Sequence, residues 1–407
     1  MKSNFKNFVG GMIAGIVLCV SFGVISEAVG ADLNTSLPFT PQQLAIIKQV
    51  KLALSAYHVD GDKKGKIDDN KMYHGAVKGL VSSLKDPYTR YSDPKDLKEE
   101  KVEMEGEYGG LGIYIASKEG RTTIIAPIED TPADRAGIKP LDEIIKVDDK
   151  NVWGMESDEI VKLLRGPAGK PVTLQIRRKN VNKLIPVKIV REIIKIKTVR
   201  MEMLPDKLAY IKLNHFNMKS DAELAAAIAK AQKNNAKGII MDLRNNPGGL
   251  LDVCVDVTSR FIPKGVVVGM RGRFEKANDT LYAKEGRANK LPLAVLVNEG
   301  SASASEIFAG AIKDYKRGKV IGMKTFGKGS VQSLFNLPDG SGIYVTIARY
   351  HTPSGFVLDH KGLTPDIKVA GEPKKNHKDD KQLQRAISVL KYEIKTKAKP
   401  KTKTTKK

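Results

Sequence analysis

The sequence predicts an α+β multidomain protein. Three observations lead to this fold class: the length of 407 residues, a change from helical to strand-like patterning near residue 99, and a second change near residue 188 to alternating strands and helices. A chain of this length exceeds one ordinary hydrophobic core. In chain order we expect a leader at 1–30, a helical N-terminal region at 31–98, a β-rich domain at 99–187, an α/β core at 188–370, and a helix with a basic tail at 371–407.

The leader is an export signal or a membrane anchor. Lys2 and Lys6 precede an uncharged, largely apolar run from Phe8 to Ile25, and small residues surround Gly30. A run of this length lies between that of a signal peptide and that of a spanning helix, so cleavage after Gly30 and retention as an anchor both remain open. Either outcome places the protein outside the cytoplasm, in the periplasm or cell envelope, with membrane contact only if the segment is kept.

The helical N-terminal region contains two segments, 42–57 and 73–84, with apolar residues spaced for one helical face. Asp86-Pro87-Tyr88 ends this pattern. Residues 380–395 have a similar amphipathic pattern before the tail. These faces either pack on one another or form a homodimer, and the sequence leaves both open.

The charge and cysteine content exclude other classes of protein. The net charge is +23, and residues 371–407, with 13 basic and 4 acidic residues, account for +9 of it. Their last run, KTKAKPKTKTTKK, has almost no apolar content and is expected to be a solvated tail. Aromatic residues are not interleaved with it, so no nucleic acid partner is expected. Of the two cysteines, Cys19 lies in the leader, and Cys254 lies in a helical pattern typical of a buried thiol.

A serine-rich segment carries the first candidate chemistry. An apolar strand ends at Asn298, and the run GSASASE then leads directly into a helix. A helix N-terminus favours an alkoxide or an oxyanion because its backbone N–H groups are free. Serine is also a common helix cap, so this segment alone favours capping over catalysis.

A candidate base follows in the run FGKGSVQ. Lys328 lies between two glycines, and Gln332 follows four residues later. If this stretch is extended, the two side chains share a face and the amide could orient the amine. A lysine acts as a base only when desolvation lowers its pKa, so we expect an apolar pocket.

A candidate oxyanion site lies in the run MDLRNNPGG, a buried strand followed by a turn. Gly248 and Gly249 can expose backbone N–H groups there, although a tight strand-to-helix turn would also need glycines.

Together these segments resemble the carboxyl-terminal processing (tail-specific) peptidases, a family of serine/lysine proteases. DPYTRY, DLRNNPGG, EGSASASEIFAGA and TFGKGSVQ stand in that family's order and cover, with the segments between them, roughly residues 40–395. The resemblance implies an α/β core of the tail-specific protease type without metal or cofactor. It implies the following roles: Ser303 as nucleophile, Lys328 as base, Gln332 as the residue that positions the lysine, and Ala304 with Gly248 or Gly249 as oxyanion donors. Ser301 and Ser305 match as supporting residues.

The β-rich domain resembles a PDZ domain. The run YGGLGIYIA resembles its carboxylate-binding loop and the strand to which a peptide adds. The residues expected to bind a peptide are Gly110, Leu111, Gly112, Ile113, Val161 and Leu164, although Leu164 serves equally well as core. Leu141 stands where such domains usually have glycine.

The resulting hypothesis is a serine endopeptidase that holds the free, apolar C-terminus of an exported protein in its PDZ groove and cleaves that protein. Two alternatives compete with this hypothesis. His351 or His360 with Asp359 would make a histidine triad, and a silent core would make the chain a PDZ adaptor that only tethers exported proteins.

Overall fold

The computed structural model describes residues 39–59, 68–118, 121–128, 130–155, 157–195, 197–374 and 376–397. The leader and the end of the basic tail lie outside these residues. The chain divides into two compact units, one formed by Met1–Glu100 with Val199–Lys407 and the other by Lys101–Thr198. No helix within the described ranges is long and apolar enough to cross a membrane.

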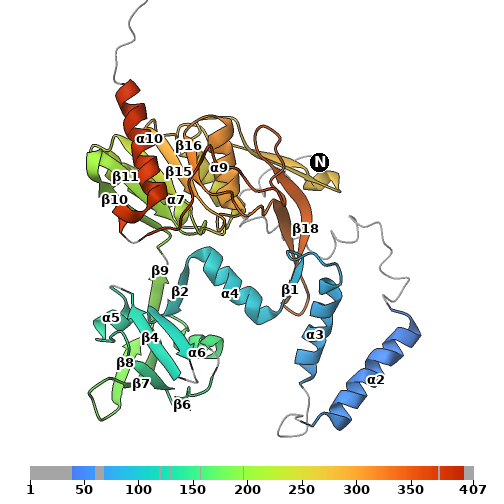
Figure 1. Ribbon diagram of the computed structural model, residues 1–407. Helices are drawn as coiled ribbons and strands as arrows, with labels where there is room; N and C mark the ends of the chain where they lie inside the picture. Colours follow the sequence, from blue (N-terminus) through green and yellow to red (C-terminus); the bar gives the residue numbers. More distant parts are fainter. Residues whose placement is uncertain are drawn as a thin grey trace, which may run out of the picture. The chain divides into compact units, whose positions relative to one another are not determined.

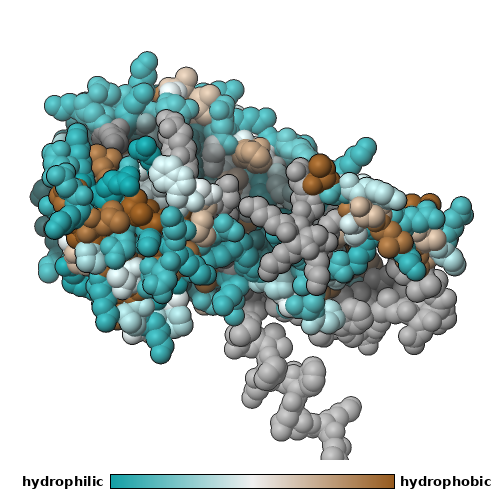
Figure 2. Space-filling view, turned by 90° about the horizontal axis from the view of Figure 1, so that it is seen from below, coloured by the Kyte–Doolittle hydropathy of each residue, from teal (hydrophilic) through white to brown (hydrophobic). Residues whose placement is uncertain are grey.

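The two expected N-terminal helices are present (Figure 1). Helix α2 (Pro41–Tyr57) begins with a capping box, in which the Thr40 and Gln43 side chains each accept the other residue's backbone N–H. Helix α3 (Asp69–Ser82) begins at Asp68, whose carboxylate accepts two backbone N–H groups. The apolar residues of α2 remain exposed, including Ile46, Ile47, Val50 and Leu52. Figure 2 shows such uncovered apolar side chains among polar ones.

A third helix in this region was not expected. Helix α4 (Pro94–Glu105) starts where the Asp93 carboxylate accepts the backbone N–H groups of Lys95 and Asp96. Its sequence, PKDLKEEKVEME, is charged on nearly every side, so it has no apolar stripe from which a helix could be predicted. Before it, the short strand β1 (Arg90–Ser92) pairs antiparallel with β18 (Gly342–His351).

The unit from Lys101 to Thr198 contains an antiparallel sheet of order β3-β4-β5-β7-β8, with β6 beside β5. Its elements are β2 (Glu107–Gly110), β3 (Ile113–Lys118), β4 (Arg121–Pro127), α5 (Pro132–Arg135), β5 (Glu143–Val147), β6 (Lys150–Asn151), α6 (Ser157–Leu164), β7 (Pro171–Arg177), β8 (Ile185–Val190) and β9 (Glu192–Lys195). The unit extends past Val187 because β9 pairs with β2. Strand β3 lies at one edge of the sheet.

The other unit contains a six-stranded sheet of order β10-β11-β12-β15-β16-β19, parallel from β11 to β19. Its strands are β10 (Val199–Leu204), β11 (Leu208–Leu213), β12 (Gly238–Asp242), β15 (Leu293–Val297), β16 (Lys319–Gly322) and β19 (Ile367–Lys368). Its helices are α7 (Ser220–Lys233), α8 (Leu251–Ser259), α9 (Ala304–Asp314) and α10 (Lys381–Lys397), with 3-10 turns η1 (Pro205–Lys207), η2 (Glu275–Ala277) and η3 (His377–Asp379).

Helix α10 packs on this sheet. Leu383, Ala386 and Leu390 are fully buried in a cluster with side chains of β11, β12, β15 and β16. The C-terminal helix is therefore part of the α/β core.

A second sheet of the same unit has the order β1-β18-β13-β14, with β17 also paired to β18. Its remaining strands are β13 (Val266–Gly272), β14 (Asp279–Tyr282) and β17 (Ser330–Asn336). The predicted α+β multidomain class is confirmed. The parallel strands β12 and β15 are neighbours, so the loops that leave their carboxyl ends, DLRNNPGG and NEGSASAS, lie at the same edge of the sheet.

Candidate active site

Ser303 occupies a strained turn between β15 and α9. It is the N-cap residue of α9, with φ +54° and ψ −116°, a conformation that residues other than glycine rarely adopt. Two neighbouring serines, Ser301 and Ser305, fix this turn through side-chain hydrogen bonds. The Ser301 hydroxyl donates to the Leu243 carbonyl at 2.8 Å, and the Ser305 hydroxyl donates to the Asn246 carbonyl at 3.0 Å. Both serines thus tie the serine turn to the loop after β12, and the half-buried Ser303 is left at the surface of the turn.

A buried carboxylate that the sequence reasoning missed joins this turn to the lysine loop. Glu306 is fully buried in the first turn of α9. One of its oxygens accepts the backbone N–H groups of Ser303 and Lys328, each at 2.9 Å. The other accepts the Gly327 N–H at 2.7 Å and the Thr325 hydroxyl. Burial raises the pKa of the Glu306 carboxyl, and these four hydrogen bonds oppose that shift.

The spacing Ser-x-x-Glu was the available signal for Glu306, because it is the sequence pattern of a capping box. It predicts the bond to Ser303 alone. The bonds to Gly327 and Lys328 join residues more than twenty positions apart, in the loop that follows β16. No local sequence pattern could therefore predict them.

Lys328 lies in the loop between β16 and β17 and is half-buried. Burial lowers the pKa of its amine, the positive charge of Arg90 lowers it further, and Glu306 opposes both. The amine nitrogen Nζ lies 5.1 Å from the centroid of the Tyr88 ring. The structure records no hydrogen bond between Ser303 and Lys328, both of which lie in described segments. Such bonds are often loose without substrate and tighten when it binds.

Gln332 lies in β17, and in the described part of the chain its side chain makes no hydrogen bond to the Lys328 amine. Its side-chain nitrogen donates to the hydroxyls of Ser330 at 2.9 Å and Thr346 at 3.3 Å. Lys328 lies before β17, which starts at Ser330, and the pairing of β17 with β18 is shifted between Val331 and Gln332. The regular alternation on which the expected shared face depends is therefore interrupted, and the pairing of Lys328 with Gln332 stays a prediction.

The two glycines of NNPGG pack in different ways. A Cβ on Gly248 would lie 2.8 Å from the Ser303 Cβ and 2.9 Å from the Ala304 nitrogen, so only glycine allows this approach. The Gly248 N–H donates to the Asn246 side chain at 2.9 Å, and its carbonyl accepts the Phe216 N–H. Because the C=O and N–H of a trans peptide point in opposite directions, the Gly249 N–H points away from Phe216.

A buried ionic network holds the start of this loop, and the sequence reasoning also missed it. Arg244 is 1% exposed. Its guanidinium bonds the Asp242 carboxylate at the end of β12 and the Asp380 carboxylate just before α10. The Lys212 amine donates to the Arg244 carbonyl at 3.0 Å. The chain's C-terminal helix is thereby tied to the loop that carries Gly248.

The alternative histidine triad does not assemble. His360 is 79% exposed at its side chain, and its Nε2 lies 3.6 Å from the Asp359 carboxylate. The Nε2 of His351 is buried without a hydrogen-bond partner. In the part of the chain that the structure describes, neither histidine contacts Ser303, and no group of three or more His, Cys, Asp or Glu residues is placed to hold a metal ion.

A groove in the other unit contains most of the residues expected to bind a peptide. It is lined by Tyr108, Leu111, Gly112, Ile113, Ile115, Val161, Leu164 and Arg165. Strand β3 forms one side of it and pairs with β4, and its other edge faces no strand among the described residues. The Arg165 guanidinium lies over the Tyr108 ring, 4.6 Å from its centroid.

Gly110 does not line this groove, contrary to the expectation. It is buried in β2 opposite Glu192 of β9, and its Cα faces the Tyr108 ring. The loop that opens the groove therefore begins at Leu111.

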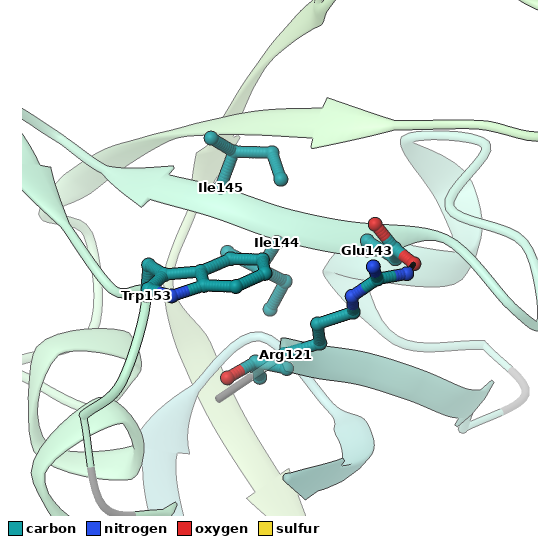
Figure 3. Close-up of a pocket in the computed structure, with 6 residues that line it drawn as sticks. Arg121, Glu143, Ile144, Ile145 and Trp153 are labelled. Carbon is teal, nitrogen blue, oxygen red and sulfur yellow. Dashed lines mark ion pairs between the residues drawn. The ribbon is translucent and has the colours of Figure 1, made fainter. Parts of the chain in front are cut away.

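A second, smaller pocket lies elsewhere in this unit (Figure 3). Trp153, the only tryptophan of the chain, lies beside Arg121, which reaches toward Glu143 at 3.8 Å. No feature of the catalytic hypothesis requires this pocket.

Comparisons with known proteins agree with these observations. The model of peptidase family S41 matches residues 207–369, a PDZ domain model matches residues 123–178, and the model described as the activating protease CtpB N-terminal domain matches residues 40–96. The carboxy-terminal-processing protease of Bartonella bacilliformis is 39% identical over 364 residues, which are 88% of this chain and 81% of that protein. The carboxy-terminal processing protease CtpA of Bacillus subtilis is 37% identical over 319 residues, which are 78% of this chain and 68% of that protein.

A solved S41 protease structure from Bacteroides fragilis supports the fold alone, with a TM-score of 0.50, 17% identity, and coverage of 88% of this chain and 98% of that one. The fold and the family match define a serine peptidase that acts on peptide or protein substrates. The chain belongs to the PDZ-containing carboxy-terminal processing proteases of family S41.

Proposed function

We propose that this peptidase cleaves exported proteins with a catalytic dyad of Ser303 and Lys328. The neutral Lys328 amine takes the Ser303 proton while the hydroxyl oxygen attacks the substrate carbonyl. The leaving amine then takes the proton from the Lys328 ammonium, and water releases the acyl group from Ser303. The observation that supports this reading best is Glu306, because one carboxylate oxygen binds the backbone of both proposed catalytic residues.

The oxyanion of the tetrahedral intermediate is proposed to bind the N–H groups of Ala304 and Gly249. Ala304 follows the nucleophile at the start of α9, where backbone N–H groups are free of helical partners. Gly249 is preferred to Gly248 because the Gly248 N–H already donates to Asn246. Gln332 is proposed to position the lysine indirectly, through Thr346 on β18.

The PDZ groove is proposed to bind a free C-terminus with an apolar last residue. Leu111, Ile113 and Val161 supply apolar walls, and the edge of β3 offers backbone groups to which a peptide strand can add. The leader is proposed to place the enzyme outside the cytoplasm. The uncovered apolar side chains of α2 are proposed to pair with a second copy of the chain.

A comparison of Ser303→Ala and Lys328→Ala with the unmodified chain tests the dyad. The substrate is an unfolded protein with an apolar C-terminus, and the matched controls are Ser388→Ala and Lys290→Ala, both at exposed positions. Both dyad variants should lose at least a thousandfold in kcat/KM, because triad and dyad members act as a unit. Unchanged proteolysis by Ser303→Ala would refute the nucleophile.

The same variants separate the enzyme from the adaptor. An adaptor would bind the substrate equally well with or without Ser303 and would not cleave it in either case. For the groove, Val161→Asp should raise KM for this substrate and leave kcat/KM unchanged for one with an amidated C-terminus. An equal effect on both substrates would refute the proposed PDZ role.

A further inference from the structure

The turn that contains Tyr88 is built into the proposed catalytic site. The Asp86 carboxylate accepts the Tyr88 N–H at 3.0 Å and the Thr89 hydroxyl at 2.7 Å, which fixes a tight local turn. The Thr89 hydroxyl in turn accepts the Thr346 N–H at 3.0 Å. Thr346 is the residue whose hydroxyl accepts the Gln332 amide. A segment of the N-terminal region is therefore attached to the strand beside the lysine loop.

The Tyr88 ring lies against the amine of Lys328. Its centroid is 5.1 Å from Nζ, within the distance at which a ring face attracts a cation. The ring has two effects on that amine. It occupies space that water would otherwise fill, which disfavours the ammonium, and its negative face attracts the ammonium once formed.

The charged and titratable groups around the amine come from several elements. Arg90 on β1 repels the ammonium, but its guanidinium is held by Glu100 at 2.6 Å and lies over the Tyr344 ring. Glu306 on α9 attracts the ammonium. Burial and the carboxylates of Asp359, Glu306 and Asp86 raise the pKa of Tyr88, so its phenol is neutral when the lysine is active.

We propose that Tyr88 is a positioning residue for the base: its ring covers one side of the Lys328 amine, keeps water from it, and holds the ammonium that forms when Ser303 gives up its proton. This inference rests on the proposed function, since it assigns a role to Tyr88 only if Lys328 is the base.

The test is the pH dependence of kcat/KM for three variants of the full chain. Tyr88→Phe keeps the ring and should retain the wild-type profile. Tyr88→Ala admits water to the amine, so the rising limb should move to higher pH, with about a tenfold loss at a fixed lower pH for each unit of movement. Tyr88→Leu still excludes water from the Lys328 amine, but its side chain does not attract the ammonium. The rising limb of the kcat/KM profile of this variant should therefore stay or move to lower pH, while kcat falls.

Tyr282→Ala removes an exposed tyrosine of the same unit and is the control for general damage. A Tyr88→Ala profile that is lowered without movement along the pH axis would overturn the inference. If Tyr88→Ala does not fold, equal kcat for Tyr88→Leu and Tyr88→Phe would overturn it as well. Retained activity in Lys328→Ala would instead refute the proposed function on which it rests.

Discussion

At the residue scale, Glu306 is the side chain that holds the site together. Glu306→Gln replaces one carboxylate oxygen with an NH2 group that faces N–H or O–H donors. Because these buried donors would lose their acceptor, we expect a loss of about 1–3 kcal/mol in the free energy of unfolding. The displaced catalytic loops should reduce kcat/KM by about a hundredfold. Denaturant unfolding and steady-state kinetics measure the two effects, and Glu275→Gln, at an exposed position, is the control.

A second prediction at this scale concerns the approach of Gly248 to Ser303. Gly248→Ala would force a Cβ to 2.8 Å from the Ser303 Cβ at a φ of +106°, so activity should fall far more than stability. Gly286→Ala is the matched control because Gly286 also has a positive φ, but no atom lies within 4 Å of its added Cβ. Equal losses of activity in both variants would mean that backbone strain, and not the contact with Ser303, is responsible.

The local patterns marked the serine run and the lysine loop as candidates, and the family resemblance selected Ser303 and Lys328 within them, but neither pointed to Glu306, Tyr88 or Arg244. The first two lie in unusual local patterns, a serine run at a helix start and a lysine between glycines. Glu306 and Arg244 read as ordinary surface charges, because their buried partners, Lys328 and Asp380, lie far along the chain.

At the element scale, the sequence predicted the helices whose apolar residues recur at a regular spacing and did not predict those without such a spacing. The period predicted α2 and α3, whereas the charged helix α4 gave no signal. The shifted pairing in β17 could not be expected either, because it depends on its partner strand β18. This shift interrupts the regular strand alternation on which the expected shared face of Lys328 and Gln332 depends.

The turn before β5 gives a prediction for this scale. Leu141 has φ +68° and is 71% exposed, and it stands at a position where PDZ domains usually have glycine. The left-handed conformation costs a leucine roughly 1–2 kcal/mol, and a glycine avoids this cost. Glycine, however, loses more backbone conformational entropy on folding, which offsets part of the stabilisation. Leu141→Gly should therefore stabilise the PDZ unit by about 0.5–1 kcal/mol in thermal unfolding. Leu184→Gly, a replacement of a leucine without positive φ, should not stabilise it.

At the scale of the whole molecule, Arg244 joins the helix at the end of the chain to the loop that carries Gly248, part of the proposed catalytic site. The amphipathic pattern predicted the helix at residues 380–395 but not its place on the parallel sheet, because a periodic apolar face does not identify its partner. Burial works to raise the pKa of Asp380, yet the hydrogen bonds and charge of Arg244 hold it below its ordinary value. Its contribution to stability is thus present above the unfolded-state pKa and is lost as the pH falls through the lower, folded-state pKa.

Asp380→Ala tests this link. The substitution leaves the buried Arg244 guanidinium paired with Asp242 but without Asp380. The free energy of unfolding at neutral pH should therefore fall by about 3–5 kcal/mol. The difference from wild type should shrink in acid, where Asp380 is protonated in both states. Asp379→Ala removes the neighbouring exposed carboxylate and should have little effect in the same denaturation series. A loss that does not change with pH would show that packing, and not the ion pair, is responsible.

The backbone of Ser303 also bears on how substrates are captured. A φ of +54° at Ser303, the proposed nucleophile, is a conformation that alanine tolerates as poorly as serine, whereas glycine adopts it without strain. A Ser303→Ala variant would therefore keep the backbone strain of the native turn. Ser303→Gly lacks the hydroxyl equally but relaxes the turn, so it is the better bait for recovering a bound, uncut substrate from cells.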